Sequence, residues 1–500
     1  MTQNPNVSQN DNFGFLVDAA LVFLGVWTIV HEIAYFIGLS FRQNWNLAIV
    51  AGCLSVVAFH RHIKKGPRLL FEKAPLQDRL VLWVSIITAM ILTACLYRPD
   101  ADDEFYLGLS VMSLDFIDRP IKTLPILKES AYALTCYDFL RAAFSHYTGV
   151  PLLSSYYLDI PALASILVII SQYRLYRLIG IQNIALAFIS FFVIMLAWGD
   201  VHRSPANLGF VKLFQGKGLL VWISIPANLY YWLRYHTTLN STYLVLLVLT
   251  SISAIGFSAT GIPIIFISFF LMSASSLVSN KHLFRDRKVI LLLASGLACL
   301  ATVAVVVITV FHHKSTGIHT AQGMRTLNSF SDHMVNIEML HFVLGDSPRA
   351  WFALLSLALT PFILKDTPYK KPFSLYITAC LFLMAFPFTS ALFGLYINES
   401  MSWRWLFLLP FVPCMVLVID KLYSQAVIAQ VKLSAGLPAL VLILFYWSSH
   451  SLISDFNHTQ FSYPKPKTPD PNNIVLRYYP DVHAHTEGSY LVSPVTGKLH

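Results

Sequence analysis

The chain has 500 residues, of which 56% are hydrophobic and only 12% are charged. These proportions exclude a water-soluble protein and predict an integral membrane protein. The sequence contains about a dozen apolar runs, and roughly 20 such residues span a bilayer, which also excludes a receptor with one span. The net charge of +9 does not indicate a nucleic-acid partner, because cytoplasmic loops of membrane proteins are enriched in Lys and Arg.

The apolar runs predict an all-α polytopic membrane protein with 12 or 13 transmembrane helices. The expected spans are about 16–40, 46–60, 78–97, 150–170, 182–199, 218–234, 242–257, 262–279, 289–311, 350–364, 372–395, 403–420 and 434–449. Residues 1–449 therefore form one transmembrane domain, and 450–500 form a tail that is too short for a core of its own.

The basic residues predict which loops share a side of the membrane. With the N-terminus inside, six short loops on the inner side hold eighteen Lys and Arg, and the much longer segments on the other side hold fifteen. The excess of Lys and Arg marks the inner side. The outer side then carries 98–149, 199–217, 312–348, 396–402 and 450–500, and we expect the tail to pack over the outer loops.

Four carboxylates lie within five residues directly after the third expected span: Asp100, Asp102, Asp103 and Glu104. Like charges this close raise one another's pKa, which suits a general base or a cation site at the membrane surface. The alternative interpretation is a solvated acidic turn, or a helix N-cap at Asp102 or Asp103.

The outer segment 98–149 is expected to contain two amphipathic helices that lie in the membrane interface, at 104–117 and 126–147. The first has an apolar stripe, at Phe105, Leu109, Met112 and Phe116. The second places Tyr132, Cys136, Phe139 and Ala143 on one side, with Lys128, Glu129 and Arg141 elsewhere. The acidic cluster opens the first helix.

A second polar segment, 199–218, lies on the same predicted side. It offers His202, Arg203, Gln215 and Lys217 as candidate substrate-binding residues, because Lys and Arg neutralise phosphate. Gly216 and Gly218 let a backbone approach closely. Lys217 is the preferred phosphate contact, and the alternative for it is a snorkelling lysine at a helix end. The spacing is not that of a nucleotide-binding P-loop.

The third outer segment, 312–348, supplies Arg325 and His333 as further candidate contacts for an acceptor or a phosphate. Its histidines do not have the spacing of zinc ligands. His31 and Glu32 lie inside the first apolar run, where an ionisable pair is either a functional site or a structural element.

Two stretches carry a resemblance to a known group of enzymes. The stretch PDADDEFYL at 99–107, the stretch LFQGKGLL at 213–220 and the arrangement of spans resemble the GT-C superfamily of membrane glycosyltransferases, more narrowly a bacterial GT-C-like family. In the usual pattern of that superfamily the acidic loop follows the first span, whereas here it follows the third expected one.

The resemblance implies transfer of a sugar from a polyprenyl-phosphate carrier to a glycan, lipid or protein acceptor. The reaction would take place on the periplasmic face of the bacterial inner membrane, with Asp102 or Asp103 as the catalytic base and Glu104 in support. It leaves open whether a divalent cation binds these three carboxylates.

Two other classes of function remain. A polysaccharide polymerase or ligase would share the outer loops and the lipid-linked substrate but lacks an early acidic pair. A transporter or lipid flippase fits the number of helices, yet such proteins place ionisable residues near the bilayer midplane and show related halves. Here the charges gather at one side instead.

Overall fold

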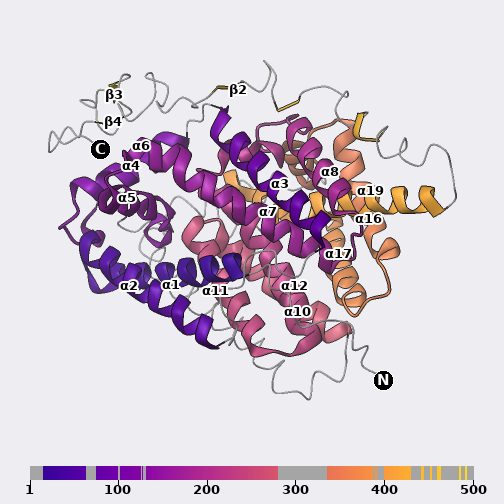
Figure 1. Cartoon of the computed structure of the whole chain (residues 1–500), viewed down its shortest axis with the longest axis horizontal. Helices are drawn as coiled ribbons and strands as arrows, with labels where there is room; N and C mark the ends of the chain where they lie inside the picture. Colours follow the sequence, from indigo (N-terminus) through magenta and orange to yellow (C-terminus); the bar gives the residue numbers. More distant parts are fainter. Residues whose placement is uncertain are drawn as a thin grey trace.

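The structure is a computed structural model of the chain, shown in Figure 1. It describes residues 15–62, 75–98, 102–124, 127, 131–279, 335–386, 389–390, 399–428, 441–443, 451–452, 459–462, 484–485 and 490–491. Within these ranges, the side chains of 102–104, 131, 335–336, 399–402, 484–485 and 490–491 are not described.

The described residues are predominantly helical, as predicted. The long helices of the first half are α1 (Phe15–Ile37), α2 (Phe41–His62), α3 (Leu76–Cys95), α4 (Asp102–Asp115), α5 (Tyr137–Thr148), α7 (Ile160–Leu178), α8 (Ile184–Ala197), α10 (Ile225–Thr238), α11 (Ser241–Phe257) and α12 (Gly261–Ser279). Those of the second half are α15 (Val335–Leu344), α16 (Pro348–Ile363), α17 (Lys370–Ala385) and α19 (Phe411–Ile428).

Shorter elements connect these helices. They include α6 (Leu152–Ser154), α9 (Gly216–Leu219), the 3-10 helices η2 (Ile121–Thr123), η3 (Ala131–Leu134), η5 (Ala206–Leu208), η6 (Phe210–Lys212) and η9 (Glu399–Leu408), and the π-helical turns η4 (Ser155–Asp159) and η7 (Leu220–Ser224). Two small antiparallel ribbons pair β1 (Leu96–Tyr97) with β2 (Gln460–Phe461) and β3 (Ala484–His485) with β4 (Tyr490–Leu491).

Five helical segments of the described chain are long and apolar enough to cross a membrane, and two sharply bent helix pairs raise that number to seven. The five are Phe15–Ile37, Leu76–Cys95, Leu152–Leu178, Gly261–Ser279 and Trp403–Val427. Of the thirteen predicted spans, 289–311 and most of 434–449 lie outside the described residues. Each of the other eleven overlaps a described helix, but 78–97 ends in β1, and the helices at 46–60, 182–199, 242–257 and 372–395 are not among the candidate spans. The fold is therefore an all-α polytopic one.

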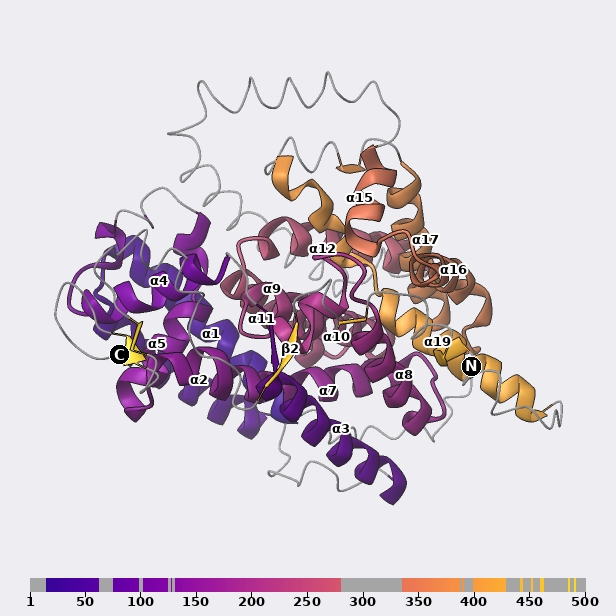
Figure 2. The ribbon, with the colours of Figure 1, turned by 90° about the horizontal axis from the view of Figure 1, so that it is seen from above.

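The helices pack around two hydrophobic cores. The smaller core joins α1, α2, α4 and α5, and it includes Phe214 from the second motif; the larger one contains most of the remaining helices. Figures 1 and 2 place α4 and α5 beside α1 and α2, with α16, α17 and α19 at the far end of the molecule. Glycine allows the closest helix crossings, since a Cβ at Gly25 would lie 2.7 Å from the Leu249 carbonyl oxygen of α11.

A proline explains each of the two π-helical turns. Pro161 and Pro226 stand directly after η4 and η7, in the first turn of α7 and of α10. Proline has no N–H to donate and its ring clashes with the carbonyl four residues earlier, so the helix widens there. The widened turns present Tyr156 and Trp222 to the interior, where both side chains are buried.

Hydrogen bonds bring the predicted outer loops together at one side of the fold, which we call the loop side. The Ile121 N–H donates to the Leu39 carbonyl at 2.9 Å, and the Cys136 N–H donates to the Gly256 carbonyl at 2.8 Å. The described part of the tail joins them, because the Ser462 N–H donates to the Cys95 carbonyl at 2.9 Å. The tail ribbon β2 thus lies on β1, just before the acidic motif in the sequence.

Charged residues next to the predicted inner loops meet one another as well. Arg174 pairs with Asp18 at 2.6 Å, Arg177 pairs with Asp78, and the Asp420 carboxylate accepts the Asn183 N–H at 3.0 Å. These contacts join the starts of α1 and α3 to the end of α7, and the start of α8 to α19. The grouping of loops agrees with the pattern of Lys and Arg, whereas the assignment of inside and outside stays a prediction.

The prediction of two amphipathic interfacial helices is wrong in its detail. Helix α4 does form, but polar as well as apolar side chains of its middle turns are buried, at Leu107, Leu109, Ser110, Val111 and Ser113. The second region is not one helix, because η3 ends at Leu134 and α5 begins at Tyr137. The periodicity of the apolar residues does not reveal that small polar side chains of α4 are also buried, bonded to backbone carbonyls.

Candidate functional site

The acidic motif forms the start of α4. The helix begins at Asp102, so the N-terminal turn contains the three motif carboxylates, whose side chains lie outside the described set. Negative charge at this end is favourable, because the N–H groups of the first turn leave a partial positive charge. Residues three and four apart share a helix face, so Asp102 and Asp103 lie one turn before Tyr106 on the same face.

The second motif meets that face. The Lys217 ammonium nitrogen lies 5.6 Å from the centroid of the Tyr106 ring, and the Lys217 side chain is only 8% exposed. A cation at this distance from an aromatic face is attracted by the ring. The two stretches that carry the resemblance are more than a hundred residues apart in the chain, yet the fold brings them into contact.

A sharp bend presents Lys217 to α4. The helical segments Ala206–Lys212 and Gly216–Thr238 meet at 115°, and the residues of the bend are held by α5. The Tyr137 hydroxyl donates to the Leu213 carbonyl at 3.2 Å, and Arg141 donates to the Phe214 carbonyl. Helix α5 therefore fixes the position of the second motif.

Arg141 is buried among aromatic rings. Its guanidinium carbon lies 4.3 Å from the Tyr137 ring and 3.6 Å from the Tyr156 ring, and the side chain is fully buried. Arg141 also pairs with Asp138, which is 4% exposed. Burial raises the pKa of Asp138 to about 6, although the charge of Arg141 and its hydrogen bond oppose the rise.

The role of this pair was not predicted from the sequence, which placed Arg141 off the apolar side of its expected helix. The available signal was the i, i+3 spacing of Asp138 and Arg141, which places opposite charges on one helix face. Such a spacing is common on exposed helices, so only the packing of α5 against the bend reveals the buried pair.

Gly216 lies where no side chain fits, which gives the first testable prediction. A Cβ at this position would lie 1.6 Å from the Phe257 carbonyl oxygen, at the end of α11. The Gly216→Ala variant must shift the backbone beside Lys217, and we expect a loss of about 1–3 kcal/mol in the free energy of unfolding.

The matched control is Gly108→Ala in α4, where a Cβ would meet nothing within 4 Å. Alanine in place of a helical glycine is neutral or stabilises by about 0.5–1 kcal/mol. Thermal unfolding in detergent compares the two variants. Equal midpoints for both would contradict the close contact at Gly216.

The other candidate residues of 199–217 do not form one cluster. His202 is exposed, and its Nε2 lies 3.3 Å from the ammonium nitrogen of Lys212, which is 2% exposed. Gln215 is buried at the bend. The Arg203 guanidinium lies 3.8 Å from the Phe342 ring centroid and 5.2 Å from that of Trp403. The structure therefore assigns them to three different surroundings.

A buried ion pair links 199–217 to the next outer segment. Arg349 pairs with Asp200 at 2.7 Å, and the Asp200 carboxylate also accepts the Ser347 hydroxyl. Both charged side chains are almost fully buried. The pair lies at the 114° bend between Ile337–Leu344 and Pro348–Ile363, so it joins the loop after α8 to this bend. The sequence analysis did not single out Arg349.

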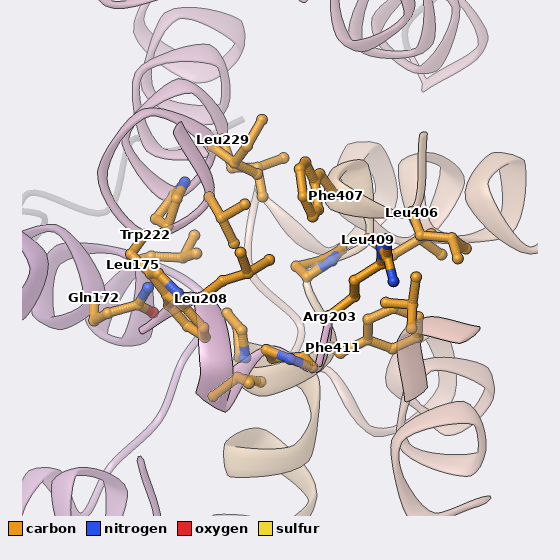
Figure 3. Close-up of a pocket in the computed structure, with 18 residues that line it drawn as sticks. Gln172, Leu175, Arg203, Leu208, Trp222, Leu229, Leu406, Phe407, Leu409 and Phe411 are labelled. Carbon is orange, nitrogen blue, oxygen red and sulfur yellow. The ribbon is translucent and has the colours of Figure 1, made fainter. Parts of the chain in front are cut away.

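A cavity near Arg203 lies between the two halves of the chain (Figure 3). Gln172, Leu175 and Trp222 form one wall, and Leu409 and Phe411 contribute to the other. None of its lining residues is a carboxylate. A reaction that needs a carboxylate base is therefore not supported there, and Arg203 belongs to the surroundings of this cavity.

Several predicted residues fall outside what the structure describes. Arg325 and His333 belong to this group, as does the metal interpretation of the histidines before residue 335. Among the side chains that are described, no three His, Cys, Asp or Glu residues lie close enough to hold a metal ion. That set does not include the carboxylates of 102–104, so a divalent cation there stays an open prediction.

His31 has a structural role. Its ring nitrogens lie 3.0 Å from the Ala133 carbonyl oxygen and 3.0 Å from the Asn44 amide nitrogen, and the side chain is fully buried. The ring also stacks on Phe139. His31 thus ties α1 to α2, η3 and α5, which decides between the two alternatives that the sequence left open.

Neither a comparison with protein-family models nor a comparison with curated proteins finds a match for this chain. The resemblance to the GT-C superfamily therefore rests on the two motifs and on the arrangement of the helices.

Proposed function

We propose that this protein is a GT-C-type membrane glycosyltransferase that transfers a sugar from a polyprenyl-phosphate carrier to a glycan, lipid or protein acceptor. The observation that carries the proposal is the contact of Lys217 with Tyr106, which joins the phosphate-binding candidate to the helix that begins with the carboxylates. The reaction needs these two groups and little else, because a phosphate leaving group requires little acid assistance.

The division of labour follows from the chemistry of each group. A carboxylate of Asp102 or Asp103 removes the proton of the acceptor hydroxyl as the sugar is transferred, with Glu104 in support. The charge that develops on the departing phosphate is stabilised by the Lys217 ammonium. A second favourable feature is the N-terminus of the helix Gly216–Thr238, because N–H groups at such an end attract anions.

The surroundings of Lys217 favour a strong interaction with phosphate. At 8% exposure its charge is shielded from water far better than that of a surface lysine. Charge interactions strengthen as the local dielectric constant falls. We propose that the reaction takes place on the periplasmic face of the bacterial inner membrane. The polyprenyl-phosphate sugar is a lipid, so it would reach the loop side from within the bilayer.

Binding of the carrier tests the proposal. We expect purified protein in detergent to bind a polyprenyl-phosphate sugar saturably and to release polyprenyl phosphate when an acceptor is present. Lys217→Met should weaken binding by about tenfold or more, since a charge-assisted hydrogen bond contributes roughly 1.5–3 kcal/mol. Isothermal titration or a filter assay with radiolabelled carrier measures the dissociation constant.

The matched control is Lys122→Met, which removes an exposed lysine of the same predicted side. It should bind the carrier as the native chain does. Absence of binding for every polyprenyl-phosphate sugar in a panel of different sugars would reject the transferase, and equal affinity of the two variants would reject Lys217 as the phosphate contact.

A further inference from the structure

Helix α5 has a second face, turned away from the Lys217 bend, that lines a groove. The groove has a volume of about 400 Å³ and lies between α1, α2, α5 and the start of α7. We call it the α5 groove. Its lining consists of Ala20, Phe23, Leu24, Trp27, Ile49, Leu140, Ala143, Phe144, Tyr147, Thr148 and Ile160.

The depth of the groove in the membrane follows from its walls. Four lining residues belong to α1, which is long and apolar enough to span a bilayer. Two lining residues of the groove are small, Ala20 of α1 and Ala143 of α5. The space of the groove lies between the helices beside these two alanines. An apolar wall at the depth of the hydrocarbon region faces lipid chains, because water does not enter that region.

Apolar contact alone does not hold a particular lipid, since the surrounding chains are as apolar as the protein. The mouth of the groove supplies polar contacts. Tyr147 is 45% exposed there, and its hydroxyl donates to the Asn46 side-chain oxygen at 2.5 Å. His146 is exposed beside it, with its ring 4.9 Å from that of Tyr147.

A positive charge lies at the same place, because Arg42 precedes Asn46 by one turn of α2 and Asn46 accepts the Tyr147 hydroxyl. Burial raises the pKa of Tyr147, and the nearby charge of Arg42 opposes the rise. The Arg42 side chain is 51% exposed and pairs with Asp118, which is 69% exposed. An exposed pair of this kind contributes roughly 0–1 kcal/mol, so a phosphate group can replace the carboxylate at little cost.

We propose that the α5 groove binds one acyl chain of a membrane phospholipid, whose phosphate lies beside Arg42 and Tyr147. The bound chain packs on Leu140 and Ala143, on a different face of α5 from Arg141. The bound chain thereby supports α5. This helix fixes the second motif, because its Arg141 donates to the Phe214 carbonyl. The proposal of a lipid site does not depend on whether the protein is a transferase.

Photolabelling of the full-length chain in phosphatidylcholine nanodiscs tests the proposal. The probe is a phosphatidylglycerol with a diazirine on its acyl chain, and mass spectrometry of peptides locates the adducts. We expect adducts at 20–27 and 140–148, and their loss in Ala143→Phe, which fills the groove. Adducts on the exposed face of α3, at Leu80, Trp83 and Val84, should persist and show that the variant is folded and inserted.

The matched control is Ala58→Phe, an exposed alanine of α2 outside the groove, which should leave both sets of adducts unchanged. Arg42→Gln should lower the labelling of the groove without changing that of α3. Three results would overturn the proposal: no enrichment of adducts in the groove over α3, unchanged groove labelling in Ala143→Phe, or competition by unlabelled polyprenyl phosphate but not by excess unlabelled phosphatidylglycerol.

Discussion

Replacing the catalytic base is expected to abolish sugar transfer while leaving the protein folded. For Asp103→Asn, or for Asp102→Asn if that residue is the base, we expect turnover to fall by about 10²–10⁴-fold, because this is the usual contribution of a general base. Asparagine keeps the size and shape of the side chain, but its amide carries no negative charge and cannot take up the proton. Release of polyprenyl phosphate by purified protein measures the effect.

Asp115→Asn provides the matched control at the other end of the same helix. Asp115 is the last residue of α4 and lies more than three turns from the acidic motif. Its variant should transfer sugar at the native rate. Native turnover by both Asp102→Asn and Asp103→Asn would refute the assignment of the base. In that case the acidic cluster would be a helix cap that complements the α4 dipole.

The largest effect on stability is expected at Arg141. Replacement with Leu leaves the Asp138 carboxylate buried without its cation and the Phe214 carbonyl without its donor. Breaking a buried ion pair on one side typically costs about 3–5 kcal/mol. We expect the free energy of unfolding in detergent to fall by this amount, and carrier binding to weaken because the bend before Lys217 loses its support.

The loss in Arg141→Leu should depend on pH, with a definite sign. The pKa of Asp138 is about 6 in the folded native chain, above its ordinary value of 3.8, because of burial. Removing Arg141 raises this pKa further. The folded variant then holds a proton that the unfolded chain lacks, so its stability falls as the pH rises through the folded pKa and stays low above it. The deficit relative to the native chain should be larger at pH 8 than at pH 5.

Two control variants separate the effect of burying the ion pair on the free energy of unfolding from the effect of its charge. Arg42→Leu breaks the exposed pair with Asp118 and should cost about 0–1 kcal/mol. The double variant Arg141→Leu, Asp138→Asn removes the stranded charge and should recover part of the loss and remove its pH dependence. A loss in Arg141→Leu that is no larger than in Arg42→Leu would contradict the buried pair.

The fold class could be predicted from the sequence because membrane helices leave a local signal. A run of about 20 apolar residues is read directly from the chain, since every backbone group in lipid must be paired within its own helix. This is why eleven of the thirteen expected spans overlap described helices. The short or interrupted elements were less predictable, as at η3 and α5, where the expected helix 126–147 is broken before Tyr137.

The candidate site could be predicted only in part. The carboxylates at 102–104 and the lysine at 217 stand out by their type against an apolar background. Arg203 stands out in the same way and was also a candidate, but in the structure it lies over Phe342 and Trp403. Which cation reaches which helix depends on the 115° bend, and a bend angle leaves no signature in residue types.

The sequence by itself determined that this protein is built from apolar helices and which residues carry unusual charge, and it predicted which segments group on each side. These properties depend on local composition, because the transfer of each segment into lipid is nearly independent of the others. Only the tertiary structure decided that Lys217 meets Tyr106, that Arg141 is buried beside Asp138, and that Gly216 lies against the Phe257 carbonyl. These contacts join residues from different helices, and their existence depends on how the helices cross.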